Sequence, residues 1–222
     1  MAEILGAVRL DDFDKRLPGG VLGKPVTMPL VQIAATSEKQ TANTMRMVRA
    51  FAGKKTLLRR KYGLQVGKTF VDTPYLGKLE QITSSETSAE GSETSFTVGD
   101  ETEHWTPAMG GTGLMETLIQ NASKSGARIL ETCNAWQPGA MSTAEKAFET
   151  WCEQQEGNSR AKQHILYDAV IAPWNTALTD DPEEGQISLT DGLKWVYQDC
   201  PWVDIEPIKN TIWATDYPTS KA

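Results

Sequence analysis

The sequence has 222 residues and a net charge of -7, with 39% hydrophobic and 23% charged residues. These values exclude a wholly disordered chain, and without a long apolar run we expect no membrane-spanning segment and no membrane partner. An evenly spread negative charge would repel a phosphate backbone, so any contact with nucleic acid must be local. Three widely spaced cysteines indicate a reducing compartment.

The first third of the chain predicts a strand followed by a helix. Residues 29–36 (PLVQIAAT) form a compact apolar run, and Met45, Val48 and Ala52 then follow at helical spacing. From residue 54 to residue 85 short β-prone segments alternate with glycines and prolines, which indicates a small irregular β excursion.

The middle of the chain continues the alternation of strands and helices. We expect strands at 95–99 (SFTVG), 127–133 (ARILETC) and 164–169 (HILYDA). A helix lies between the first two and ends at Gly126, and a capping box at Ser142 begins another that buries Phe148, Trp151 and Cys152. This alternation predicts an α/β fold with a mainly parallel sheet, whose ligands bind beyond the carboxyl ends of the strands.

The last quarter of the chain predicts a helical appendage. Two short helices are expected, one with Leu189 and Leu193 on its apolar face, the other starting after Asp204 as N-cap. Four tryptophans gather in this region, which indicates an apolar face that packs either onto the sheet domain or onto another molecule.

Adjacent acids, Asp100 and Glu101, end the predicted strand at 95–99. On a parallel sheet the first acid can reach a magnesium ion that bridges nucleotide phosphates, and the second can orient or deprotonate an attacking water. This is the Walker B arrangement. An acidic pair that merely starts the next turn explains the same residues, and this alternative stays open.

A phosphate loop of the form GxxxxGK[ST] is missing from the sequence. Residues 63–69 (GLQVGKT) and 19–25 (GGVLGKP) imitate it, but each has three residues between the glycines instead of four. We interpret both as ordinary loop glycines.

Several stretches resemble the ATPase region of terminase large subunits, the motors that package DNA in tailed bacteriophages. They are PLVQIAATSEKQTANTMRMVRAF, LEQITSSETSAEGSETSFTVGDETEHW, ARILETCNAWQPG, ILYDAVIAP and DGLKWVYQDCPWVDIEPI. They occur in consistent order over most of the chain. The resemblance implies a P-loop ATPase fold of the ASCE type, with residues 1–173 as a partial ATPase domain and 174–222 as a helical linker before a nuclease domain.

The resemblance also implies roles for individual residues. Asp100 would be the magnesium-associated carboxylate and Glu101 the catalytic acid that activates water. Thr132, Cys133 and Asn134 would match the coupling motif, which senses the γ-phosphate of ATP, although Asn134 could also simply make a turn. Magnesium and ATP would be cofactor and substrate, and double-stranded DNA, the portal and the small terminase subunit would be partners in the host cytoplasm.

The sequence also departs from the family pattern, and these departures predict weak ATP hydrolysis. In the family, the Walker A loop and its strand lie upstream of the region matched here. Residues 1–6 of this sequence resemble only the helix that follows that loop. At the other end, we expect the nuclease domain of the family to be absent. Glu90 stands where many terminases carry an arginine, so no arginine finger is assigned. Two internal strand edges would be exposed unless another chain supplies the missing strand. We therefore expect poor ATP hydrolysis by this chain alone.

Two other functions remain open. The first is a non-catalytic split-gene product that works only after docking onto a chain with the missing strand. The second is a metal-dependent DNA nuclease that uses Asp100, Glu101 and Asp168 around two ions.

A basic run is the candidate for contact with DNA phosphates, although a solvated charged face is the simpler explanation of these residues. Its members are Lys54, Lys55, Arg59, Arg60 and Lys61. His104 and Trp105 follow the acidic pair, and we interpret Trp105 as a core residue.

Overall fold

The computed structural model describes residues 8–17, 20–74, 76–83, 91–162 and 165–214. The chain packs as two units, Met1–Ala147 and Phe148–Ala222. This packing boundary lies upstream of the domain boundary predicted after residue 173. Among the described helices, none is both long and apolar enough to cross a lipid bilayer.

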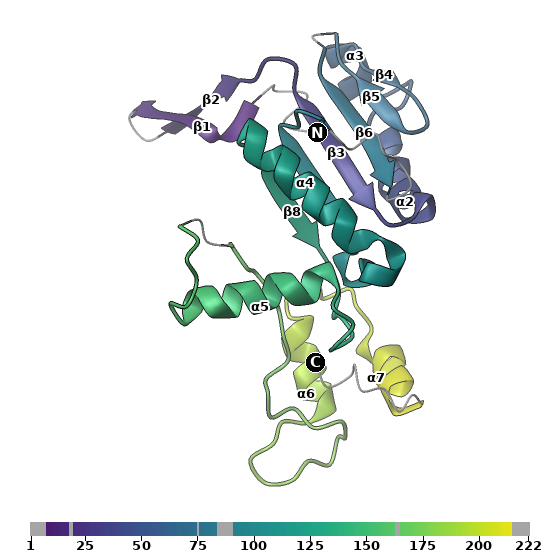
Figure 1. Cartoon of the computed structure of the whole chain (residues 1–222). Helices are drawn as coiled ribbons and strands as arrows, with labels where there is room; N and C mark the ends of the chain where they lie inside the picture. The colour runs from purple at the N-terminus through teal and green to yellow at the C-terminus, as the bar shows by residue number, and fades with distance from the viewer. Residues whose placement is uncertain (1–7, 18–19, 75, 84–90, 163–164, 215–222) are drawn as a thin grey trace. The chain divides into compact units, whose positions relative to one another are not determined.

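A six-stranded sheet forms the centre of the first unit (Figure 1), with the order β4-β5-β6-β3-β7-β8. The strands are β3 (Leu30–Ala35), β4 (Gln65–Val66), β5 (Phe70–Asp72), β6 (Lys78–Thr83), β7 (Phe96–Asp100) and β8 (Arg128–Thr132). Neighbours from β6 to β8 run parallel, whereas β4 and β5 add antiparallel pairs at one end. The predicted α/β fold with a mostly parallel sheet is confirmed.

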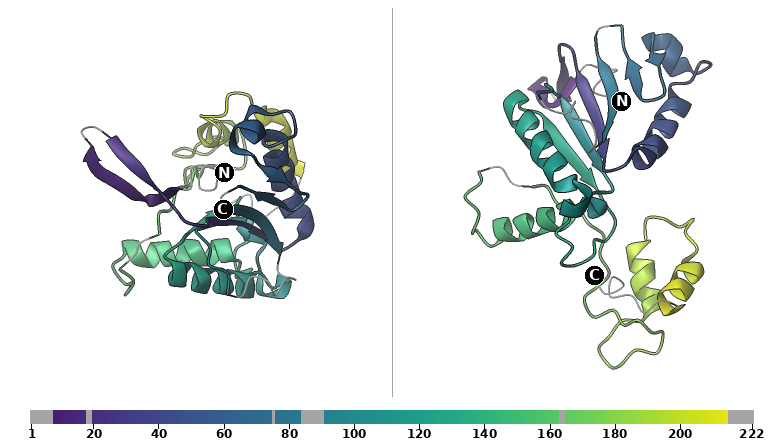
Figure 2. Two further views of the ribbon diagram at one scale, coloured as in Figure 1. Left: turned by 90° about the horizontal axis from the view of Figure 1, so that it is seen from above. Right: turned by 45° about the vertical axis from the view of Figure 1, so that its right-hand side comes forward.

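Helices cover the two faces of this sheet, as the right-hand view of Figure 2 shows. On one face, α2 (Glu38–Phe51) packs its buried Met45 against Val31 and Ile33 of β3. On the other face, α4 (Gly111–Ser125) packs with the fully buried Trp105. We call these the α2 face and the α4 face. The predicted helices that end near Ala52 and at Gly126 are confirmed.

The basic run adopts a helix, and the expected small β excursion follows it as β4 and β5. Helix α3 (Leu57–Tyr62) begins at Thr56, whose hydroxyl accepts a hydrogen bond from the Arg59 amide, and ends at Gly63 with φ 62°. This left-handed conformation favours glycine, so Gly63 terminates a helix and is not part of a phosphate loop. The predicted strands near residues 70 and 80 correspond to β5 and β6.

An antiparallel hairpin precedes the sheet and was not predicted. It consists of β1 (Val8–Leu17) and β2 (Gly20–Pro25). Residues 1–6, which resemble the helix after a Walker A loop, lie outside the described residues.

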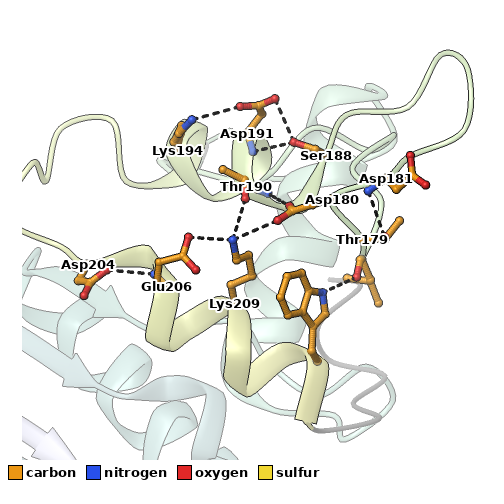
Figure 3. A network of polar contacts seen from close by, with 12 residues as sticks. Thr179, Asp180, Asp181, Ser188, Thr190, Asp191, Lys194, Asp204, Glu206 and Lys209 are labelled. Atoms are coloured by element: carbon orange, nitrogen blue, oxygen red, sulfur yellow. Dashed lines mark hydrogen bonds and ion pairs between the residues drawn. The ribbon is translucent and has the colours of Figure 1, made fainter.

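The second unit contains the two predicted C-terminal helices, α6 (Leu189–Val196) and α7 (Ile205–Ala214). The Asp204 carboxylate accepts a hydrogen bond from the Glu206 amide, which confirms the predicted N-cap. Figure 3 shows Lys209 of α7 between Asp180, Glu206 and Thr190, with ammonium distances of 3.1, 2.8 and 3.3 Å. Since its side chain is only 10% exposed, this ammonium ties α7 to the preceding loop and to α6.

The strand predicted at 164–169 does not form in residues 165–169. Contacts with α5 (Thr143–Gln155) hold this segment instead: the Tyr167 ring stacks on Trp151 and the Ile165 amide donates to Gln154. Phe148 and Trp151 are half-buried, so the predicted burial of this helix face is partial. A parallel strand needs a neighbouring strand to satisfy its backbone, and the described part of this unit offers none.

Candidate functional site

The carboxyl ends of three neighbouring parallel strands meet at one edge of the sheet. In the ladder, Ala34 of β3 lies beside Gly99 of β7, and Asp100 lies beside Thr132 of β8. The strand with the acidic pair and the strand with Thr132 are therefore sheet neighbours. Side chains after each strand converge because parallel strands in register end together.

Asp100 receives hydrogen bonds from two hydroxyl groups. Thr44 of α2 donates to one carboxylate oxygen at 2.6 Å, and Thr132 donates to the other at 3.0 Å. Asp100 is half-buried, and its side chain shares the α2 face with Val98 because alternate strand residues point the same way. The two hydroxyls fix the carboxylate while leaving part of it accessible.

Glu101 adopts an unusual backbone conformation. Its φ of 56° and ψ of 50° lie in the left-handed region, which costs a non-glycine residue about 1 kcal/mol or more. The Gln40 amide nitrogen donates to its carboxylate at 2.7 Å. Strained residues of this kind concentrate at functional sites, so the conformation supports a role for Glu101 beyond that of a turn.

Gln40 is itself oriented by the turn that starts α2. Its side-chain oxygen accepts hydrogen bonds from Thr36 at 3.2 Å and from Ser37 at 3.0 Å. Ser37 also caps the helix by accepting from the Gln40 backbone amide at 3.4 Å. Thr36 and Ser37 therefore both start the helix and hold the amide that reaches Glu101.

Trp105 stabilises the backbone at the acidic pair. Its indole nitrogen donates to the Asp100 carbonyl at 3.1 Å, and the side chain is fully buried. A Cβ at Gly111 would come within 2.4 Å of the Cα and Cβ atoms of Trp105, so α4 approaches the Trp105 backbone through a glycine. The interpretation of Trp105 as a core residue is confirmed, whereas His104 is exposed.

The hydrogen bond that Asn134 donates goes to a residue that follows the acidic pair. Its amide donates to a carboxylate oxygen of Glu103 at 3.1 Å. Of the predicted coupling residues, Thr132 thus contacts Asp100 directly, and Asn134 contacts the turn that follows it.

Glu131 of β8 is an acid that the sequence reasoning did not single out. Burial raises the pKa of its carboxyl to about 7, and the neighbouring Thr102 hydroxyl partly opposes this rise. Local desolvation, followed by the carboxylates of Glu103 and Glu131, raises the pKa of the Cys133 thiol. A raised thiol pKa disfavours the thiolate at neutral pH, so Cys133 is a poor nucleophile.

The residues of the basic run lie just before α3 and within it. Lys54, Lys55, Arg60 and Lys61 are exposed and Arg59 is half-buried. Asp168, the third acid of the nuclease hypothesis, is exposed and belongs to the second packing unit. Within the described residues no group of three or more His, Cys, Asp or Glu side chains is arranged to hold a metal ion by itself.

Hard oxygen donors dominate the site, with Asp100 and Glu101 as carboxylates and Thr132 as a hydroxyl. Such donors suit magnesium, which usually takes one or two protein carboxylates and completes its shell with water and substrate phosphates. Asp100 is a carboxylate that could fill the first role, and the Glu101 carboxylate is a group that could accept a proton. The fold and the site define an α/β protein with a preorganised acidic edge.

Comparison with known proteins adds a viral context. No protein-family model matches the chain. The chain is 33% identical over 230 residues to the Gene 13 protein of Mycobacterium phage D29. The aligned region covers 97% of this chain and 38% of that protein. The Gene 13 protein of Mycobacterium phage L5 is 32% identical over 237 residues, or 100% of this chain and 39% of the relative. The chain thus spans about two fifths of the length of these relatives.

Gln40 and Thr44 are the site residues that sequence reasoning missed. They lie four residues apart, three and seven positions after the N-cap Ser37, and so share one side of α2. Because a helix that follows a parallel strand begins at the strand's carboxyl end, this spacing was the signal that could have identified them.

Proposed function

We propose that this chain supplies the acidic edge of a magnesium-dependent, ATP-driven DNA-packaging motor, as part of a terminase large subunit. The single observation that carries the proposal is the gathering of Asp100 and Glu101 with Thr132 at the carboxyl edge of neighbouring parallel strands. The resemblance to terminase ATPase regions supports it, and the bacteriophage relatives are consistent with it.

In this proposal each acid has one task. Asp100, held by Thr44 and Thr132, associates with magnesium at the nucleotide phosphates, and the metal supplies neutralisation of phosphate charge. Glu101, held by Gln40, orients the attacking water and accepts its proton. Thr132 lies next to Asp100 and is the residue best placed to respond to loss of the γ-phosphate.

The partners follow from the same resemblance. Double-stranded DNA, the portal and the small terminase subunit would meet the motor in the host cytoplasm. The basic run around α3 is the candidate contact for DNA phosphates, because its exposed lysines and arginines form a local positive region on a chain of net charge -7.

A non-catalytic module is the second candidate function. The 222 residues contain no GxxxxGK[ST] motif, so the phosphate cradle has to come from elsewhere. In that case the chain would act only after a partner supplies a phosphate-binding strand. In the part of the chain that the structure describes, no feature favours the nuclease hypothesis over these two.

The test is ATP turnover in two preparations. The chain alone should release phosphate at background rate. A chimeric Gene 13 protein of phage D29, in which this chain replaces the matched region, should hydrolyse ATP in a magnesium-dependent manner. A folded chimera without turnover would contradict the proposed function, and robust turnover by the chain alone would contradict the need for a separate phosphate cradle.

A further inference from the structure

Helix α2 contacts both acids of the site. Gln40 donates a hydrogen bond to the Glu101 carboxylate at 2.7 Å, and Thr44 donates to the Asp100 carboxylate at 2.6 Å. The two donors lie about one turn apart on the same side of the helix. Because both contacts come from one rigid element, a displacement of α2 acts on both acids together.

The amide of Gln40 has its orientation fixed by the turn that starts α2. Its side-chain oxygen accepts hydrogen bonds from Thr36 and Ser37, so its NH2 group is left to face Glu101. The direction of the donor toward Glu101 is therefore set by the position of this turn.

The backbone of Glu101 is held by other contacts. Its carbonyl accepts a hydrogen bond from the His104 amide at 3.0 Å, and the Trp105 indole holds the preceding carbonyl at 3.1 Å. These contacts do not involve Gln40. The hydrogen bond from Gln40 thus fixes the side chain of Glu101 and not the turn itself, which makes Gln40 a positioning residue.

The other end of α2 is joined to the basic run. The helix ends at its C-cap Ala52, and a short turn with Lys54 and Lys55 leads to Thr56, the N-cap of α3. Hydrogen bonds close this turn, because the amide and the hydroxyl of Thr56 donate to the Gly53 carbonyl at 3.0 and 2.9 Å. The basic run therefore follows α2 through a hydrogen-bonded turn.

Helices α2 and α3 also share one hydrophobic core. Met45 and the C-cap Ala52 are fully buried in a cluster against which Leu58 and Tyr62 of α3 pack. Close-packed side chains and rigid helices carry energetic coupling between distant positions. A ligand held at the basic run can thus act on α2 through this core.

The charge of the run defines the ligand. Residues 54–61 contain five lysines and arginines and no acid, on a chain of net charge -7. Four of these cations are exposed, and Lys61 also lies over the Tyr62 ring at 5.2 Å. A local group of exposed cations fits a phosphate backbone, which is the DNA ligand of the proposed function.

We propose that α2 links the basic run to Glu101, with Gln40 as the positioning residue. Phosphates of DNA bound at the run restrict α3 and α2, and the Gln40 amide then holds the Glu101 carboxylate in the direction needed to orient water. Without DNA the side chain of Glu101 leaves this contact more often. The inference rests on the proposed function and deepens it by naming how DNA controls the acid.

The experiment follows the link by NMR in the chain alone, with a short blunt-ended DNA duplex as the probe. The side-chain amide signals of Gln40 and the side-chain carboxyl signal of Glu101 should shift during the titration, together with the backbone signals of α3. Absence of binding at α3 would overturn the inference. So would α3 signals that shift while those of Gln40 and Glu101 stay in place.

Variants test whether the link passes through the Gln40 amide. In Gln40→Ala the α3 signals should still shift, but the Glu101 carboxyl should no longer respond to DNA. Asn43→Ala is the matched control, because Asn43 is exposed on the same helix, and it should keep the full response. Replacing Lys54 and Lys55 together with glutamine should reduce the shifts at α3 and at Glu101 in parallel. A Glu101 response that survives Gln40→Ala would overturn the inference.

A second substitution guards against misfolding of the first. If circular dichroism shows that Gln40→Ala is unfolded, Gln40→Glu keeps the length of the side chain but removes the donor at neutral pH. The same loss of the Glu101 response is expected. A preserved response in this variant would contradict the role of the Gln40 donor.

Turnover separates this outcome from that of the proposed function. In the D29 chimera, DNA should raise ATP turnover by about fivefold or more, through kcat rather than KM, and Gln40→Ala should abolish this difference. A chimera without ATP turnover would contradict the proposed function, while the NMR titration would still decide the link. An active chimera whose Glu101 signal ignores DNA would support the function and overturn the link.

Discussion

Strands β3 and β8 belong to the same sheet but differ in how completely they are covered. The residues of β3 from Val31 to Ala35 are all buried, and both helical layers contact this strand. In β8 the residues alternate between exposed and half-buried, and Leu130 is the apolar residue left open. In this comparison the β3 side is fully packed, whereas the β8 side leaves apolar surface exposed among the described residues.

The largest predicted effect concerns the two strands directly. Ile33→Ala removes a side chain that is 4% exposed and should lower the free energy of unfolding by about 3 kcal/mol. Leu130→Ala should cost less than about 1 kcal/mol, because that side chain already contacts water. Urea denaturation of both variants measures the difference. Equal costs would mean that β8 is as fully packed as β3.

The next effect is a pH dependence on the β8 side. The pKa of Glu131 is raised to about 7 in the folded chain from 4.5, so the folded state binds the proton more tightly. Stability from this group is therefore full below pH 4.5 and is lost as pH rises toward 7, by roughly 1–3 kcal/mol.

Substitution isolates this contribution. Glu131→Gln should flatten the fall in stability between pH 5 and pH 8 in thermal unfolding, whereas Glu116→Gln, on an exposed position of α4, should leave it intact. An unchanged pH profile in the Glu131 variant would show that this carboxyl does not titrate with folding.

A smaller, local effect is expected in the second unit. Lys209→Met keeps the apolar stem but removes the ammonium that bonds Asp180, Glu206 and Thr190. Amide exchange in α7 should become several-fold faster, while exchange in β3 and β7 stays as in the original chain. Lys194→Met is the control, since Lys194 forms a surface ion pair with Asp191. Exchange that changes across the sheet as well would show that the network stabilises more than this helix.

The sequence predicted the main elements of the sheet because their signals are local. Apolar runs marked β3 and β7, and Gly126 marked the end of α4. The acidic pair was found because it ends a strand, whereas Thr132 was named through the resemblance to the coupling motif of terminases.

Other features could not be predicted because they depend on tertiary contacts. The strand expected at 164–169 had the right apolar sequence but lacks a neighbour to pair with in the described residues. The roles of Gln40 and Thr44 emerge only when α2 is placed over the sheet edge. The burial that raises the pKa of Glu131 depends on the turn after β7, which periodicity does not reveal.

The most direct test of the account is the rate of ATP hydrolysis by the chimeric D29 Gene 13 protein with Glu101→Gln. The account predicts that turnover falls by about 100-fold or more while nucleotide binding is kept, since the base that accepts the proton from water is lost. Glu116→Gln should leave turnover unchanged. Full turnover in the Glu101 variant would contradict the claim that this edge of the sheet activates water for ATP hydrolysis.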